Sequence, residues 1–71
     1  MPILTINILE GRDDKTKKQL IKNVTDTVVD TLEVPIESVR VMINELPFTH
    51  YGVAGLPVKE YRLKKIKENK S

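Results

Sequence analysis

A helical period runs through residues 14–32, DKTKKQLIKNVTDTVVDTL, and determines how the segments on either side of it are arranged. At about 100° per residue, five apolar side chains share an arc of about 120°, wide enough to cover a sheet: Leu20, Ile21, Val24, Val28 and Leu32. Lys17 falls in the same arc, in the first turn, where its stem can lie on the core while its charge reaches water. The pattern predicts an amphipathic helix capped by Asp13 or Asp14 and ended by Pro35.

Strand patterns flank this helix on both sides. Residues 1–10, MPILTINILE, are nearly all apolar, with Pro2 at the start, where a strand tolerates proline. Residues 38–46 alternate, so that Val39, Val41 and Ile43 point one way and Arg40, Met42 and Asn44 the other. A strand, a helix and a strand make a β-α-β unit with parallel strands and a right-handed crossover. The predicted fold class is therefore α/β (α+β), built on a single β-α-β unit.

The remainder of the chain carries weaker signals. Residues 48–57, FTHYGVAGLP, contain two glycines and two aromatic residues and predict a loop that leads into a short hairpin or coil. The final segment, VKEYRLKKIKENKS, is expected to form a short strand or helix that frays into a basic end. The domain prediction is one domain over residues 1–62 and a basic, frayed tail over residues 63–71.

Size and composition limit what such a domain can be. The chain has 71 residues, one histidine and no cysteine, so neither a disulfide nor a cysteine-based zinc site is available. A core this small is marginal on its own, and two strands leave sheet edges unpaired. We therefore expect a homo-oligomer with shared sheets, and no metal or cofactor.

Charge is distributed unevenly along the chain. Residues 1–58 carry six basic and eight acidic side chains, a net −2, whereas residues 59–71 carry six basic and two acidic ones, a net +4. The lysines of the tail lack interleaved aromatic residues or a helical stripe, so a solvated end is expected, with neither nucleic acid nor a membrane as partner. Without a signal peptide pattern or an apolar run long enough for a membrane span, the expected location is cytoplasmic.

Three residues could together perform acid–base chemistry on an anion. If the initiator methionine is removed, Pro2 supplies a terminal secondary amine, which an apolar pocket and nearby cations would keep neutral and able to act as a general base. Arg40 lies at the start of its strand, and parallel strands place it at the same end of the sheet as Pro2. Arg12 lies beyond the far end of the first strand, about 33 Å away for ten extended residues, so it can reach Pro2 only from another copy of the chain. Each residue alone has an ordinary structural explanation.

The combination of motifs resembles the 4-oxalocrotonate tautomerase family of the tautomerase superfamily. The resemblance covers residues 2–55 and depends on a proline after the initiator, ILEGR at 8–12, SVR at 38–40 and an aromatic-glycine pair at 51–52. It implies small enzymes built as β-α-β protomers, in hexamers that are trimers of dimers. It also implies a cofactor-independent isomerase that moves a proton on an enol or unsaturated 2-keto acid of the 4-oxalocrotonate or 2-hydroxymuconate type.

The resemblance also assigns roles to residues of this chain. Pro2 matches the base, Arg40 the arginine that binds a substrate carboxylate and steadies enolate charge, and Arg12 the arginine that holds a distal carboxylate. Tyr51 stands where the family usually has phenylalanine, which keeps the pocket dry. Arg62 matches a further arginine near the site. Catalytic roles are thus implied for Pro2, Arg40 and Arg12, and substrate binding for the two arginines with Tyr51 and Arg62.

Two alternatives remain open at this stage. The same scaffold hosts hydratase and dehalogenase chemistry, in which a cationic Pro2 acts as an acid. A non-enzymatic oligomer whose basic tail recruits an acidic partner is the other. Among further polar residues, His50 is expected to be a loop histidine, while Glu10 and Glu45 are expected to be solvated carboxylates. A retained Met1 would block the amine and exclude base catalysis by Pro2.

Overall fold

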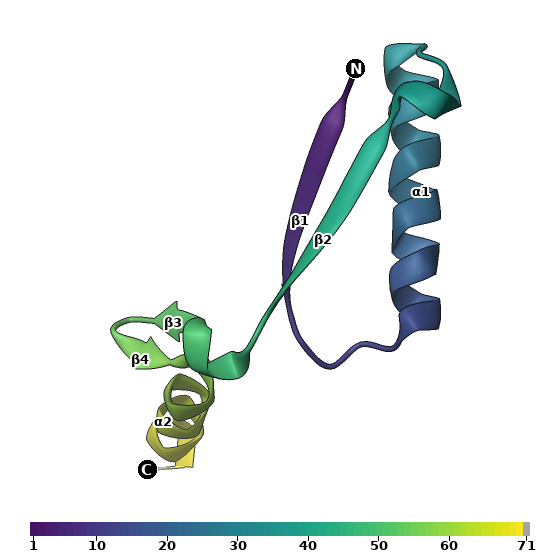
Figure 1. The fold of residues 1–71 in the computed structure, drawn as a ribbon. Coiled ribbons are helices and arrows are strands. Elements are labelled where there is room, and N and C mark those ends of the chain that lie inside the picture. The colour runs from purple at the N-terminus through teal and green to yellow at the C-terminus, as the bar shows by residue number, and fades with distance from the viewer. Residues whose placement is uncertain (71) are drawn as a thin grey trace.

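The β-α-β unit forms as the sequence predicts. The computed structural model describes the backbone of residues 1–70 and the side chains of residues 1–67. Strand β1, Ile3–Leu9, pairs in parallel with β2, Arg40–Leu46, in a register that places Ile3 beside Arg40 and Leu9 beside Leu46. Helix α1, Asp14–Leu32, connects them and packs along one side of the two strands (Figure 1). The predicted second strand begins two residues late, because a 3₁₀ turn, η1, occupies Ile36–Ser38.

The two ends of α1 are fixed by local backbone chemistry. The Asp13 side chain accepts a hydrogen bond from the backbone N–H of Thr16 at 2.9 Å, which satisfies one of the free donors of the first turn. At the other end, Glu33 adopts a left-handed conformation with φ of 55° and donates its N–H to the carbonyl of Val29. Lys17 is half-buried and its ammonium contacts Glu45 of β2 at 2.6 Å, which ties the first turn of α1 to the end of the sheet.

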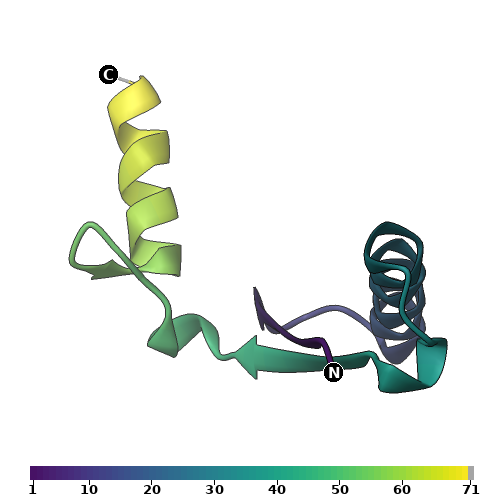
Figure 2. The ribbon, with the colours of Figure 1, turned by 90° about the horizontal axis from the view of Figure 1, so that it is seen from above.

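The C-terminal arm, residues 48–70, extends away from this unit. A 3₁₀ turn, η2 at Phe48–His50, leads into a hairpin of β3, Gly52–Val53, and β4, Leu56–Pro57. The hairpin turns at Ala54 and Gly55, which both have positive φ, as a two-residue type I′ turn requires. Helix α2, Val58–Lys70, follows directly and stands apart from α1 (Figure 2).

The tail differs from its prediction in one respect. Of the two alternatives, strand or helix, residues 58–70 form a helix, and the segment expected to fray from residue 63 continues as the last turns of α2 to Lys70. Its Lys, Glu and Leu residues favour helix, and neither Gly nor Pro interrupts them. The last residue of the predicted tail, Ser71, lies outside the described residues. The division into a domain of residues 1–62 and a tail of residues 63–71 stays a prediction.

A single chain buries little of its apolar surface. Only Val39 and Val58 are buried apolar residues among those described. The exposed area is 5678 Å², whereas a compact protein of this mass exposes about 4,500 Å². The radius of gyration is 16.9 Å, against about 11 Å for a compact domain of this length. On the sheet face turned away from α1, Ile3 and Met42 are 61% and 49% exposed.

The cap of α1 leads to a stability prediction. The hydrogen bonds from Thr16 lower the pKa of the Asp13 carboxyl below its ordinary value. A carboxyl with a lowered pKa in the folded state adds stability above its unfolded pKa and loses that contribution as pH falls through the folded pKa. We expect Asp13→Ala to lower the melting temperature at pH 7, and the difference from the wild type to shrink at pH 3, as circular dichroism would measure. Asp13→Asn, which keeps the acceptor, is the control and should lose less than Asp13→Ala at pH 7; equal losses would contradict the capping role.

Candidate active site

Pro2 and Arg40 meet at one end of the sheet. The backbone N–H of Arg40 donates to the carbonyl oxygen of Pro2 at 3.0 Å, which extends the parallel ladder by one step beyond β1. Pro2 is half-buried, and Leu4, two residues further along, lines a hollow together with residues of α1. The geometric expectation that these two residues share one end of the sheet is therefore correct. The end is fixed by backbone hydrogen bonds, so a substitution of either side chain leaves the ladder itself intact.

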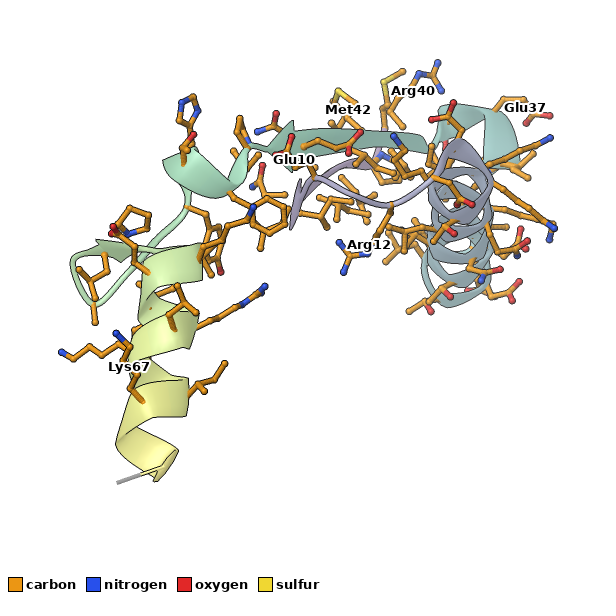
Figure 3. The ribbon with its side chains drawn as sticks, turned by 90° about the horizontal axis from the view of Figure 1, so that it is seen from below. Glu10, Arg12, Glu37, Arg40, Met42 and Lys67 are labelled. Carbon is orange, nitrogen blue, oxygen red and sulfur yellow. The ribbon has the colours of Figure 1, made fainter. Side chains whose placement is uncertain are left out.

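The Arg40 guanidinium is held by the chain that leads into β2. Its Nη1 donates to the carbonyl oxygens of Glu37 and Val39. The side chain is exposed, and with Met42 it projects from the sheet face opposite α1 (Figure 3). A guanidinium has five N–H donors, and the bonds to described residues use only Nη1, which leaves the Nε and Nη2 donors for an anion such as a carboxylate. The sequence pattern did not predict that these carbonyl oxygens hold Arg40. The one signal for them in the sequence is Pro35, which precedes the 3₁₀ turn.

Arg12 lies at the other end of the sheet. Its Nη1 donates to the carbonyl oxygen of Leu9 at 3.3 Å, at the last residue of β1. Seven residues of strand separate this point from Pro2, a span of about 23 Å. Figure 3 shows Arg12 and Arg40 well apart, on opposite sides of the strands. One chain therefore does not bring Arg12 to Pro2.

Tyr51 and Arg62 belong to the C-terminal arm. Tyr51 follows η2 and is 41% exposed, and its carbonyl oxygen accepts the backbone N–H of Val58, the first residue of α2, at 2.8 Å. Arg62 is exposed on the second turn of α2. The arm begins after Leu46, where β2 ends, and so departs from the end of the sheet opposite Pro2 (Figure 1). Of the five predicted site residues, one chain gathers only Pro2 and Arg40.

The other acidic and basic candidates lie apart from Pro2. The Lys17 ammonium donates a hydrogen bond to Glu45, and this bond, followed by the one that it donates to Asp14, raises the pKa of Lys17. Glu45 is exposed, as expected of a solvated carboxylate, and in addition it forms an ion pair with Lys17. His50 ends η2 and is exposed, as expected of a loop histidine. Within the described part of the chain, no three His, Asp or Glu side chains are grouped so as to hold a metal ion.

Two surface hollows lie elsewhere on the chain. One, of about 310 Å³, runs between β1 and α1 and is almost entirely apolar: its lining is Leu4, Asn23, Val24, Thr27 and Val28. The other, of about 380 Å³, lies on the arm. Neither is lined by Pro2, Arg40 or Arg12. The single chain thus places the predicted site residues toward its two ends. In the described helices, no stretch is both long and apolar enough to cross a bilayer.

Known proteins match nearly the whole of this arrangement. The family model described as "Tautomerase enzyme" matches residues 2–61. The 2-hydroxymuconate tautomerase of Pseudomonas sp. strain CF600 is 42% identical over 62 residues, which are 87% of this chain and 98% of that protein. The 2-hydroxymuconate tautomerase of Stutzerimonas stutzeri is 46% identical over 59 residues, 83% of this chain and 94% of the relative.

Solved structures agree with these sequence matches. A 4-oxalocrotonate tautomerase isozyme from Methylibium petroleiphilum superposes with a TM-score of 0.82 at 38% identity, over 89% of this chain and 98% of the other. A heterohexameric 4-oxalocrotonate tautomerase from Chloroflexus aurantiacus gives a TM-score of 0.80 at 35% identity, over 84% and 97%. The family resemblance and the fold class inferred from the sequence are confirmed. The chain belongs to the tautomerase enzyme family and is an isomerase.

Proposed function

We propose that this tautomerase shuttles a proton on an enol or unsaturated 2-keto acid, with the amine of Pro2 as the base and without a cofactor. The nitrogen takes a proton from one position of the substrate and returns it to another carbon, while the double bonds shift between them. The substrate and the product are isomers with the same atoms and the same oxidation state, so the reaction consumes no oxidant, reductant or water. The observation that carries the proposal is the hydrogen bond from Arg40 to the Pro2 carbonyl, which sets a guanidinium-bearing residue beside the chain terminus.

Base catalysis needs the amine to be free and uncharged. Removal of Met1 frees the nitrogen of Pro2, and burial in an apolar surround favours the neutral form. Pro2 is half-buried, and guanidinium groups brought to it by Arg40 and by Arg12 of another chain would lower the pKa of its amine further. A neutral amine at neutral pH is matched to the proton transfer that tautomerisation requires. Base catalysis by Pro2 thus requires both an apolar environment at the start of β1 and an arginine side chain near the amine.

The arginines would hold the substrate and stabilise its charge. The free Nε and Nη2 donors of Arg40 suit the carboxylate and the enolate oxygen next to it, where charge develops as the proton leaves. Arg12, exposed at the other end of the sheet, suits a distal carboxylate. Two such arginines favour a dicarboxylate, and the name of the relatives, 2-hydroxymuconate tautomerase, specifies one. Tyr51 would wall the pocket against water, and Arg62 would contribute a further contact.

The site would be completed by association of several chains. Arg12, Tyr51 and Arg62 lie at the opposite end from Pro2, and a single chain leaves large apolar residues such as Ile3 and Met42 in water. Both features favour a homo-oligomer, and the heterohexamer among the similar structures supports a hexamer; its arrangement as a trimer of dimers stays a prediction. A small-molecule substrate in the cytoplasm, with neither nucleic acid nor a membrane as partner, stays the prediction for its setting.

The protonation state of Pro2 distinguishes this proposal from the hydratase and dehalogenase alternatives. We expect the protein, shown by mass to have lost Met1, to ketonise phenylenolpyruvate with kcat/KM that rises with pH through the pKa of the amine. A neutral base gains activity as it loses its proton, whereas a cationic acid loses activity over the same range. The measurement is the pH–rate profile by ultraviolet absorbance. A profile that falls with rising pH would favour the alternatives, and absence of ketonisation would end the tautomerase proposal.

A further inference from the structure

The last part of α2 lies outside the match to the family. The family model ends at residue 61, and 62 residues of this chain account for 98% of the Pseudomonas relative. Residues 62–71 therefore lie beyond the end of the family model. They belong to the segment that carries a net charge of +4, whereas residues 1–58 carry a net −2. The family model therefore does not account for most of this charge.

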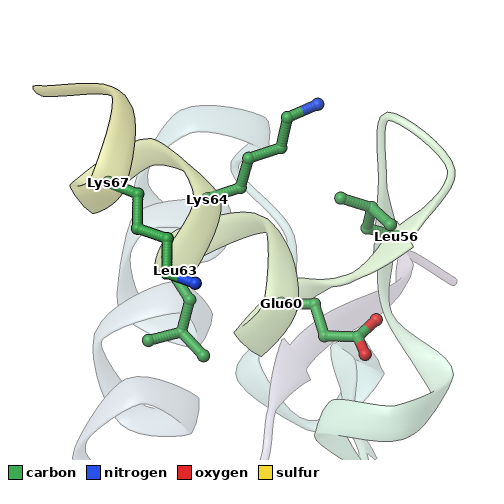
Figure 4. A pocket seen from close by; sticks show the side chains of 5 residues that line it. All are labelled: Leu56, Glu60, Leu63, Lys64 and Lys67. Carbon is green, nitrogen blue, oxygen red and sulfur yellow. The ribbon is translucent and has the colours of Figure 1, made fainter. Parts of the chain in front are cut away.

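Two of these lysines line the hollow of the arm. Lys64 and Lys67 are three residues apart and so lie on one face of α2, together with Leu63. Leu56 of β4 faces them across the hollow, which has a volume of about 380 Å³ (Figure 4). Most of the lining surface is apolar, although three of the five lining residues are charged, and among the described residues Glu60 is the acidic one. Apolar walls below exposed ammonium groups suit an organic anion better than a bare inorganic ion.

The position of α2 is coupled to Tyr51. The helix starts at Val58, which is buried and whose N–H bonds to the carbonyl of Tyr51. The ammonium of Lys59 lies 4.7 Å from the centre of the Phe48 ring, so the first turn is also bound to η2. The hairpin, η2 and the start of α2 are therefore packed against one another. The helix that carries Lys64 and Lys67 thus starts beside Tyr51, and the two lysines follow about 9 and 14 Å further along its axis.

We propose that Lys64 and Lys67 form an anion entry site, which attracts carboxylate substrates to the pocket walled by Tyr51 and favours dianions over monoanions. This inference rests on the proposed function, because it assumes that Tyr51 borders the pocket. Clustered charge of one sign raises the rate of encounter with an oppositely charged ligand, and the gain depends on the charge of that ligand and on salt. The entry site acts before chemistry, so it contributes to kcat/KM and leaves kcat unchanged.

The test compares a double variant, Lys64→Gln with Lys67→Gln, with the wild type on 2-hydroxymuconate, a dianion, and phenylenolpyruvate, a monoanion. At low ionic strength we expect kcat/KM to fall about tenfold for the dianion and less for the monoanion, with kcat unchanged. In about 1 M salt, where screening acts within about 3 Å, the difference should vanish. The control, Lys18→Gln with Lys22→Gln on the exposed face of α1, removes the same charge and should change either substrate little.

Three results would overturn the entry site: an equal loss in the α1 control, equal losses for the two substrates, or a loss that salt does not abolish. Any of these with Pro2→Ala inactive leaves the proposed function intact and removes only the entry site. Full turnover by Pro2→Ala, in contrast, removes the proposed function, and the salt dependence then reports on another catalytic route. The two failures are thus distinguishable in one set of assays.

Discussion

Replacing Pro2 by alanine is expected to lower kcat/KM by about 10²–10⁴-fold, the range that a positioned acid–base group contributes. Alanine keeps a free terminus but substitutes a primary amine for the secondary one. The fold should survive, because the ladder uses the carbonyl oxygen of residue 2, which alanine also has. The measurement is ketonisation of phenylenolpyruvate, with circular dichroism and sedimentation to confirm an unchanged fold and assembly.

A second proline serves as the control for this change. Pro57 ends β4 in the arm, and Pro57→Ala removes a ring of the same size far from the chain terminus. We expect it to retain most of the activity. Near-wild-type turnover by Pro2→Ala, with Met1 removed and the assembly intact, would show that the amine is not the base.

Mixing two inactive variants should restore activity. In the proposed site, Pro2 and Arg12 come from different chains, so an assembly formed from Pro2→Ala and Arg12→Ala chains contains some sites with both residues intact. For random mixing at equal amounts, about a quarter of the sites qualify. We therefore expect two variants that are each nearly inactive to recover up to about a quarter of wild-type turnover when refolded together.

The matched control for mixing uses chains that cannot complement. Pro2→Ala refolded with the double variant Pro2→Ala, Arg12→Ala should stay inactive, because no chain supplies the amine. Native mass spectrometry would establish that mixed assemblies form in both experiments. Mixed assemblies of the complementary pair without recovered activity would contradict a site shared between chains.

Local patterns made the β-α-β unit predictable. The apolar stripe of residues 14–32 and the strand patterns around it are readable because each follows one period, and Asp13 and Pro35 mark the ends of the helix. The pairing of Pro2 with Arg40 followed from parallel strands alone. The start of β2 was misplaced because Ser38 bonds backward to Pro35 through both its N–H and its hydroxyl, which closes a turn where alternation suggested strand.

The arm was harder to predict for physical reasons. In residues 58–70 the apolar residues do not keep to one face of the helix, so Val58 is buried while Leu63 and Ile66 are exposed. The spacing of the apolar residues therefore does not indicate a helix, although the helix propensities of the individual residues favour one. The partners of Arg12 and Tyr51 are also invisible to local patterns, since they depend on how several chains assemble. The one indication of assembly that the sequence could provide was that Arg12 cannot reach Pro2 within its own chain.

Titration of the Pro2 nitrogen tests the central claim most directly. Protein with ¹⁵N-labelled proline, confirmed by mass to lack Met1, would be followed by NMR as pH is raised. The account predicts that this nitrogen loses its proton below the range of about 7.7–8.0 that an ordinary α-amino group shows, and that its midpoint matches the rise in kcat/KM. A nitrogen that does not titrate because methionine acylates it, or one that stays protonated throughout the pH range of activity, would contradict base catalysis by Pro2.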